Sequence, residues 1–344
     1  MKNHQVGVVG YGWAATAHID AINATRQGRV AAVCSSRPLD AAELSARHGG
    51  PIKVYRELGE MLADPSLGVI DITSYPSRHR DEAVAAARAK KHVILEKPMA
   101  NSAAEVRDIV AAARENGVRG CVCFELLFSS QARATMALLR EGLIGRLHYG
   151  EVDYFHGVGP WYGQFRWNTG KKDGGSALLS AGCHALNFLL ALMGDEVESV
   201  TSTSTKSSSP IFAPYEYDTT SVTVLRFKGG AVGKSVACID CLQPYYLHTH
   251  LVGSEGSVLD DRFHSSKLEA DKSQWSRLSM KLCDSGDVSD HPYQAQFQAF
   301  FDALDAGQDM PLTSLPAAAR TFDVIFAADE SAARGGVSVQ PARG

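Results

Sequence analysis

The sequence has little that would place this protein in a membrane, outside the cell or on a nucleic acid. No apolar run approaches the length of a membrane-spanning helix, and Met1-Lys2 leads into the first predicted strand without a signal-peptide core. The net charge of −4 argues against nucleic acid or an anionic membrane as partner. The seven cysteines are odd in number and scattered, which favours reduced thiols. We therefore expect a cytoplasmic protein with neither a membrane nor a nucleic-acid partner.

Patterns of metal ligands are also sparse. Cys238 and Cys241 form a C-x-x-C pair, but no second pair lies nearby, which favours core thiols over a zinc or redox site. His248 and His250 share one face of a predicted strand, and two histidines without a third ligand make a poor metal site. That face can equally be buried in an oligomer interface. The sequence predicts no metal centre.

The first third of the chain alternates short apolar strands with helices. Its 344 residues, of which 45% are hydrophobic and 21% are charged, suffice for two globular domains with a large core. Strands are predicted at 6–9, 30–34, near 54, and at 69–73, 92–95 and 119–124, with helices between them. Regular strand–helix alternation predicts a doubly wound parallel sheet. We assign residues 1–124 to this domain.

After residue 124 the pattern changes to consecutive strands. These strands are predicted at 147–155, 197–205, 221–227, 232–242 and 247–252, and one long helix at 176–193 interrupts them. Two late helices are predicted at 293–305 and 316–333. Strands that follow one another without helices favour an antiparallel sheet. Residues 125–344 are therefore predicted as a second α/β domain with an open, mostly antiparallel sheet.

A glycine turn follows the first strand. Gly10 permits a tight turn, Gly12 lets the backbone approach a pyrophosphate, and the small Ala15 allows close packing of helix on strand. The strand before this turn and the helix after it raise the G-x-G-x-x-A match above chance. The first N–H groups of the helix have no partner within the helix and face the phosphates. The turn predicts a dinucleotide site, with Trp13 and Ala14 among its residues.

The second strand indicates which dinucleotide is preferred. It ends in Ser35, Ser36 and Arg37, with no acid before Asp40. An acid at this position binds the ribose 2′-hydroxyl of NAD, whereas an arginine suits a 2′-phosphate. We predict a preference for NADP(H), with NAD(H) possible. The alternative is that Arg37 points to solvent, since some NAD enzymes lack the acid.

Ligands of doubly wound sheets bind beyond the carboxyl ends of the strands, so the residues there are candidates. Ser74 and Tyr75 follow the fourth strand, and His79 either caps the next helix or touches the cofactor. Glu96 and Lys97 follow the fifth strand, and the next residue, a proline, keeps Lys97 out of a helical conformation. A lysine held on a turn beside a nicotinamide can act as an acid or base.

Several motifs in order along the chain resemble those of the Gfo/Idh/MocA oxidoreductases. They are Gly10-x-Gly12-x-x-Ala15 with His18, His92-Val93-Ile94-Leu95-Glu96-Lys97-Pro98, Gly142-Leu143-Ile144-Gly145, Gly174-Gly175-Ser176-Ala177-Leu178-Leu179 leading to His184, and Ser331-Ala332-Ala333-Arg334-Gly335. The resemblance implies a nicotinamide cofactor, a sugar or polyol substrate, and homodimers or homotetramers formed through the second sheet. It also implies that Lys97 and His184 are the catalytic lysine and histidine.

The helix that carries His184 departs from the family pattern. The family often has acids at the positions of Ser180 and Asn187, which share a helix face with His184. We expect these two side chains to orient the substrate. Trp161, Arg166 and Trp167 are expected to bind it too, because aromatic rings stack on sugars and a cation suits an anionic sugar. A structural loop over the sheet is the alternative. Weaker candidates are Glu125, Tyr154, His156, Tyr162, Lys171, Lys172, Tyr245, His291 and Tyr293.

These residues predict an NAD(P)-dependent enzyme that transfers a hydride to or from a secondary alcohol or ketone of a sugar, polyol or sugar acid. Lys97 is the acid/base and acts with His184. In one alternative, a tightly bound cofactor oxidises a sugar transiently, and elimination or glycoside cleavage follows. In another, the chain is a non-catalytic nucleotide-binding sensor.

Overall fold

The computed structural model describes residues 4–194, 196–269, 271–282 and 291–342. The chain divides into two compact units. The first comprises Met1–Glu125 and Pro292–Ala319, and the second comprises Leu126–His291 and Arg320–Gly344. The division by sequence has nearly the same main boundary, but it assigns residues 292–319 to the second domain, whereas in the structure they pack with the first unit.

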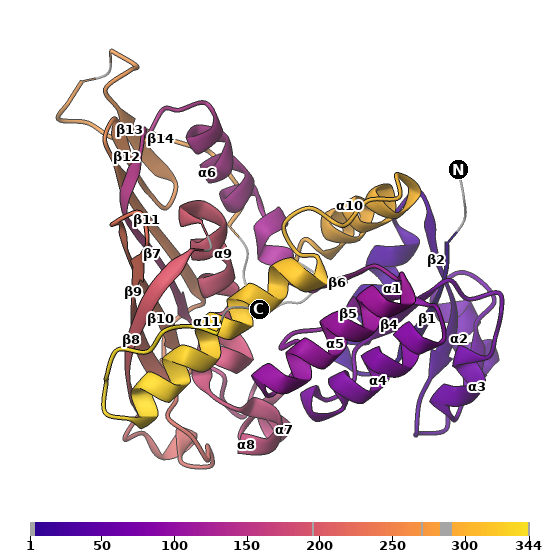
Figure 1. The fold of residues 1–344 in the computed structure, drawn as a ribbon. Coiled ribbons are helices and arrows are strands. Elements are labelled where there is room, and N and C mark those ends of the chain that lie inside the picture. Colours follow the sequence, from indigo (N-terminus) through magenta and orange to yellow (C-terminus); the bar gives the residue numbers. More distant parts are fainter. Residues whose placement is uncertain (1–3, 195, 270, 283–290, 343–344) are drawn as a thin grey trace. The chain divides into compact units, whose positions relative to one another are not determined.

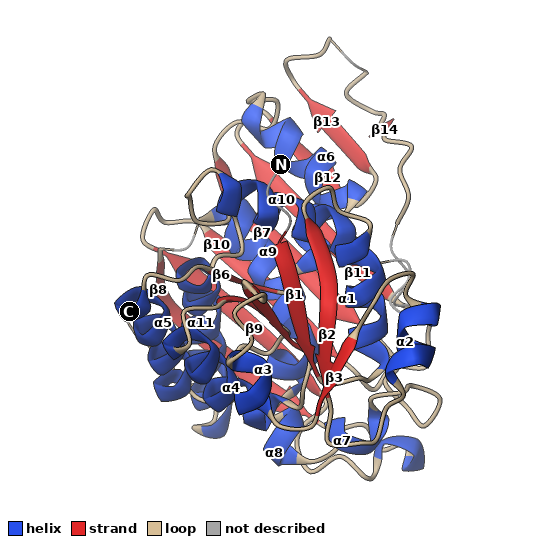
Figure 2. Cartoon of the chain, turned by 90° about the vertical axis from the view of Figure 1, so that its right-hand side faces the viewer, coloured by secondary structure: helices blue, strands red, loops and turns tan. Residues whose placement is uncertain are grey.

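The first unit contains a sheet of six parallel strands in the order β3-β2-β1-β4-β5-β6 among the described residues. The strands are β1 (His4–Val9), β2 (Gly28–Cys34), β3 (Lys53–Tyr55), β4 (Val69–Ile72), β5 (His92–Leu95) and β6 (Gly120–Val122). Val6, Ile70 and Ile94 are fully buried, as expected where helices cover both faces of a parallel sheet. The prediction of a doubly wound parallel sheet is confirmed. Figure 2 shows β1, β2 and β3 side by side.

Helices cover this sheet, and their ends follow local sequence signals. They are α1 (Trp13–Asn23), α2 (Ala41–Arg47), α3 (Leu58–Leu62), α4 (Pro76–Arg88), α5 (Ala103–Asn116) and α10 (Tyr293–Asp305), and α11 (Leu315–Ala333) begins in this unit. The Ser102 hydroxyl caps α5 by accepting the N–H of Glu105, and Gly117 ends that helix in a left-handed conformation. Helix α1 packs against α10, and α4 packs against α5 (Figure 1).

The second unit contains a mixed sheet in the order β14-β13-β12-β11-β7-β10-β9-β8. Its strands are β7 (Leu147–Phe155), β8 (Val197–Thr205), β9 (Thr220–Phe227), β10 (Val232–Cys238), β11 (Tyr246–Gly253), β12 (Gly256–Leu259), β13 (Arg262–Ser265) and β14 (Ser276–Arg277). Among the described strands of this sheet, only β7 and β10 pair in parallel. The prediction of a mostly antiparallel second sheet is confirmed.

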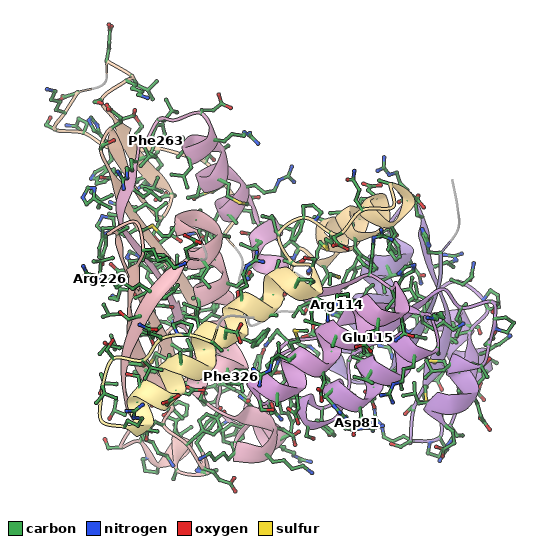
Figure 3. The ribbon with its side chains drawn as sticks, viewed as in Figure 1. Asp81, Arg114, Glu115, Arg226, Phe263 and Phe326 are labelled. Carbon is green, nitrogen blue, oxygen red and sulfur yellow. The ribbon has the colours of Figure 1, made fainter. Side chains whose placement is uncertain are left out.

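One face of the second sheet is covered by α9 (Cys183–Met193), which packs on β7 and β10. A Cβ added to Gly150 would lie 2.5 Å from Met193 Sδ, so the glycine permits this close approach. Side chains alternate along a strand, and Glu151 therefore lies on the opposite face, which we call the open face. Arg226 of β9 projects from the open face, away from α9 (Figure 3).

The predicted long helix at 176–193 has an irregular start. Leu178–Gly182 forms a π-helical turn, and α9 follows it. A Cβ on Gly182 would lie 2.3 Å from Ala237 Cβ of β10, so the segment lies tightly on the sheet. The expectation that no apolar run approaches membrane-spanning length is wrong for Lys171–Met193, which is long and apolar enough to span a membrane, but 83% of its most apolar window is buried within the protein, as in a core helix.

Cys238 and Cys241, which the sequence predicts as core thiols, are half-buried at the end of β10. That prediction is therefore wrong in detail.

The second unit also contains the helices α6 (Ser130–Arg140), α7 (Phe165–Asn168) and α8 (Lys171–Gly174).

Candidate functional site

The glycine turn after β1 leaves open space in front of helix α1. Gly10 has φ +96°, its N–H donates to the Cys34 carbonyl oxygen at 2.9 Å, and an added Cβ would lie 3.1 Å from the Thr73 carbonyl oxygen. Helix α1 begins after Gly12 without a side-chain cap, and a Cβ on Gly12 would meet nothing within 4 Å. The helix N-terminus thus offers backbone donors and room, as a dinucleotide pyrophosphate requires.

The end of β2 presents a cation beside this turn. A surface hollow there is lined by Tyr11, Gly12, Trp13, Thr16, Arg37, Pro38 and Leu39. The Arg37 guanidinium donates to the Tyr11 carbonyl oxygen, and the buried Ser35 hydroxyl accepts the Arg37 N–H at 3.1 Å. Asp40, the first acid after β2, caps α2 by accepting the N–H groups of Ala42 and Glu43 at 2.7 and 2.9 Å. Ser36 is exposed.

The loop after β4 is tied to the turn that follows β5. His79 is fully buried, with Nδ1 2.7 Å from the Pro98 carbonyl oxygen and Nε2 3.1 Å from the Ser74 carbonyl oxygen. The Ser74 hydroxyl donates to Glu82, and the Tyr75 ring is half exposed (52%). His79 therefore has a structural role, joining the two loops. A contact of His79 with the cofactor stays a prediction.

The backbone of Lys97 is held by a buried network. Glu96 Oε2 accepts the Lys97 N–H at 2.9 Å, and Glu96 Oε1 accepts His18 Nε2 at 2.9 Å and the Tyr293 hydroxyl at 3.1 Å. The other nitrogen of His18, Nδ1, lies 3.0 Å from Asp71 Oδ1. Glu96 thus accepts hydrogen bonds from three protein donors and holds the turn, and a contact of Glu96 with the cofactor stays a prediction.

The network fixes the charges around Lys97. Burial alone would lower the pKa of His18, but the charges and hydrogen bonds of Asp71 and Glu96 outweigh burial and raise it to about 10. His18 is therefore an imidazolium that donates to both carboxylates. Burial and the nearby Glu96 raise the pKa of Glu125 to about 8, against the opposing effect of Lys97. Glu125 is therefore mostly a neutral acid at pH 7.

In the second unit, aromatic rings surround His184. The His184 ring stacks on Tyr154 with centroids 6.3 Å apart and an interplanar angle of 18°. The Tyr154 hydroxyl lies 3.2 Å from His156 Nδ1, and the Tyr245 ring lies edge-on to Tyr154 at 5.4 Å. Tyr162 lies edge-on to His156 at 4.9 Å. The weaker candidates Tyr154, His156, Tyr162 and Tyr245 thus form one cluster with His184.

The remaining second-domain candidates lie on separate elements. Asn187 donates from Nδ2 to the Thr321 hydroxyl of α11 at 2.9 Å, and Ser180 lies beside the Tyr217 hydroxyl. Trp161 is 61% exposed, and its Nε1 donates to the Gly157 carbonyl oxygen at 2.9 Å. Trp161 also lines a hollow with His156, Gly157, Tyr162, Cys241, Leu242, Gln243, Pro244 and Tyr245. Arg166 and Trp167 lie on α7. Ser180 lies in the π-helical turn Leu178–Gly182, and His184 and Asn187 lie on α9 directly after it. A shared, substrate-facing side for these three residues stays a prediction.

Sequence reasoning missed the function of three buried residues in the first unit. His18 and Tyr293 hold Glu96, and Asp71 holds His18, but neither Asp71 nor this network was predicted. One signal was present, since Asp71 is an acid within an otherwise apolar strand. An acid in such a strand needs a buried partner, and the histidine of the first helix is that partner.

Comparison with known proteins agrees with the division of the chain into two parts. Residues 4–124 match the family described as "Oxidoreductase family, NAD-binding Rossmann fold". Residues 132–259 match the "GFO/IDH/MocA C-terminal domain". The two matches belong to one family, follow its domain order and together span most of the chain.

Curated relatives of the chain are named as oxidoreductases. Myo-inositol 2-dehydrogenase of Thermotoga maritima is 24% identical over 305 residues, 88% of this chain and 89% of the relative. Levoglucosan dehydrogenase of Pseudarthrobacter phenanthrenivorans is 25% identical and covers 85% of this chain and 82% of the relative. An uncharacterized oxidoreductase of Synechocystis is 31% identical, but the match spans about half of each protein, 56% of this chain and 52% of the relative.

Solved structures share the fold. A levoglucosan dehydrogenase in complex with NADH and levoglucosan superposes with a TM-score of 0.86 over 99% of this chain and all of that one, at 22% identity. A probable dehydrogenase from Thermotoga maritima superposes with a TM-score of 0.82 over 98% of each chain, at 21% identity.

Proposed function

Since this chain belongs to the Gfo/Idh/MocA oxidoreductases, whose N-terminal domain binds NAD, we propose that it transfers a hydride to or from a secondary alcohol or ketone of a sugar, polyol or sugar acid. Two relatives that span most of the chain are named for myo-inositol and levoglucosan, which are both polyhydroxylated rings. The observation that carries the proposal is the turn after β5, where the buried carboxylate of Glu96 binds the backbone N–H of Lys97. This turn lies at the same carboxyl edge of the parallel sheet as the glycine turn.

The first unit binds the dinucleotide in this proposal. Its contacts come from Gly10, Gly12, Trp13, Ala14, Ser35, Ser36, Arg37, Ser74, Tyr75, His79, Glu96 and Lys97. Arg37 favours NADP(H), because its guanidinium lies at the glycine turn and Asp40 is engaged as a helix cap. NAD(H) remains a possible cofactor.

Lys97 is the acid/base of the reaction in this proposal. When bound, the nicotinamide accepts or gives the hydride, and the substrate oxygen must lose or gain a proton in the same event. Lys97 is half-buried, and Glu96 binds its backbone N–H, so its side chain extends from a fixed backbone position. His184 donates to the same oxygen or relays the proton. Its buried ring is oriented by stacking on Tyr154.

The second unit binds the sugar in this proposal. Trp161, Arg166, Trp167, Ser180 and Asn187 contact the substrate together with Lys97 and His184. The exposed Trp161 ring suits stacking on a sugar face, and Arg166 suits a carboxylate. Turnover of uronates tests this, because exclusive use of neutral sugars would argue against an anionic substrate.

Transfer of deuterium tests the reaction class. We expect C-deuterated myo-inositol or levoglucosan to reduce NADP⁺ in the presence of the enzyme and to place the deuterium at nicotinamide C4, as read by mass spectrometry. Product formed without net use of nicotinamide would instead support transient oxidation followed by elimination. Dinucleotide binding without turnover of any neutral or acidic sugar tested would support a sensor.

A further inference from the structure

Three metal-ligating side chains meet on the open face of the second sheet. His248 and His250 alternate on β11, so both project to the same face. Glu151 of β7 lies directly opposite His250 in the antiparallel register. The sequence offered only the two histidines, because the third residue is brought in by strand pairing across a separation of about a hundred residues.

The ligand atoms face one another at short range. His248 Nε2 lies 3.9 Å from Glu151 Oε1, and His250 Nδ1 lies 4.0 Å from Glu151 Oε2. One nitrogen of each histidine and one oxygen of Glu151 all lie within 4.8 Å of one another. All three side chains retain some solvent exposure, at 13% for Glu151, 18% for His248 and 34% for His250. In a single chain an ion can therefore reach them from the open face.

The outer partners of the cluster favour metal binding. His248 Nδ1 lies 3.1 Å from Asp260 Oδ1, and Asp260 in turn accepts the Thr249 N–H at 2.9 Å. When the Asp260 carboxylate accepts a hydrogen bond from Nδ1–H of His248, the Nε2 lone pair is directed at Glu151. This is the arrangement that orients metal-bound histidines. The cluster therefore has three ligand atoms, and one ligand, His248, is oriented by Asp260.

We propose that Glu151, His248 and His250 form a site for a divalent cation of the zinc type. Two imidazole nitrogens and one carboxylate oxygen, with a fourth position open, are a set that Zn²⁺ accepts. Bonds of about 2.0–2.2 Å place ligand atoms about 3.4 Å apart in a tetrahedron. Side-chain rotations that bring the ligand atoms closer together by about 0.5–1.4 Å close the observed gaps. This site is separate from the proposed hydride transfer.

The side chains around the cluster carry an excess of negative charge, which favours binding of a dication. Lys234 binds Glu151 Oε1, but its Nζ also lies 3.0 Å from Asp153 Oδ2, so the ammonium keeps one carboxylate when a metal takes the other. The Tyr149 hydroxyl donates to Glu151 Oε2 at 2.6 Å. The carboxylates of Glu151, Asp153 and Asp260 outnumber the single lysine, which leaves a net negative charge for the ion to neutralise.

Titration calorimetry with zinc sulfate on the full chain, metal-stripped and without a histidine tag, tests the site. We expect one Zn²⁺ per chain with micromolar or tighter affinity. His250→Asn and Glu151→Gln should each weaken binding at least tenfold, whereas His148→Asn, which changes an exposed histidine on the same strand, should leave it unchanged. Circular dichroism of each metal-free variant checks that it is folded. Substitution with Co²⁺ should give the visible absorption of a tetrahedral ion, and His250→Asn should remove it.

Two results would overturn the proposal. One is the absence of saturable Zn²⁺ binding to the folded wild-type chain. The other is an affinity for Zn²⁺ that is the same in His250→Asn and Glu151→Gln as in the control His148→Asn. The ion would then bind elsewhere.

Discussion

Burial acts on two ionisable side chains of the first unit with opposite outcomes. His18 has carboxylates on both ring nitrogens, and these raise its pKa to about 10 despite burial. Glu125 is also buried, and the nearby Glu96 carboxylate adds to the effect of burial in raising its pKa to about 8. At the residue scale, the partner of a group therefore decides whether burial leaves that group charged.

Replacing Glu125 with glutamine should remove a pH dependence of stability. The folded chain keeps a proton on Glu125 between its ordinary pKa of 4.5 and its raised value of about 8, whereas the unfolded chain loses it there. The free energy of unfolding therefore falls as pH rises through this window, by at most about 1.4 kcal/mol per pH unit. Between pH 5 and 8 we expect wild type to lose a few kcal/mol more than Glu125→Gln in urea titrations. Parallel losses in the two proteins would contradict the assignment.

Replacing Arg37 with alanine should change the choice of dinucleotide. Loss of a charged hydrogen bond to a 2′-phosphate corresponds to about 1.5–3 kcal/mol. We expect the KM for NADPH to rise about 10- to 100-fold, while the KM for NADH changes little. Arg114→Ala, which removes an exposed arginine in the last turn of α5, serves as the matched control. A wild-type enzyme that prefers NADH strongly would contradict the preference for NADP(H).

At the scale of elements, the periodicity of apolar residues and the positions of turn-forming residues predicted most strands and helices. The apolar runs at 69–73 and 92–95 marked β4 and β5. Contacts between elements far apart in the sequence were beyond reach, because the sequence specifies neither the register of paired strands nor which helix packs on which strand. Glu151 opposite His250 is one example, and the contact of Asp71 with His18 is another. The π-helical turn before α9, which lies where Gly182 approaches β10 closely, was missed as well.

The links among α1, β4 and the turn after β5 make His18 a positioning residue for Lys97. In His18→Gln the amide can donate to only one of the two carboxylates. We expect a loss of about 3 kcal/mol or more in unfolding free energy, because a buried charge loses its partner. Glu96 would lose its charged donor while it keeps the Tyr293 hydroxyl and the Lys97 N–H, so kcat should also fall about 10- to 100-fold, with little change in dinucleotide affinity.

The pH dependence and a matched variant check this prediction. The folded-state pKa of His18 is raised, so its stabilising effect is complete below pH 6.5 and is lost as pH rises toward 10. The stability difference between wild type and His18→Gln should therefore shrink over that window. Tyr293→Phe removes one neutral hydrogen bond to the same Glu96 oxygen and should cost only about 1 kcal/mol. Equal effects of the two variants would argue against a charged His18.

For the whole molecule, the two units differ in how far their sites could be predicted. The cofactor end follows from local sequence, because the glycine turn, the end of β2 and Lys97 each lie within a few residues of a strand end. In the second unit the candidates are not marked by nearby strand ends. The cluster of His184, Tyr154 and His156 forms only when β7 packs on α9. Assembly into homodimers or homotetramers through the open face stays a prediction.

The most direct test of the account is the effect of Lys97→Met on turnover and on dinucleotide binding. If Lys97 moves the proton, kcat for the sugar oxidised by wild type should fall by about 10²- to 10⁴-fold, while the Kd for NADPH changes less than about threefold. Lys53→Met, which removes an exposed lysine of β3, should leave both values unchanged. A Lys97→Met enzyme that keeps near-native kcat would contradict the account.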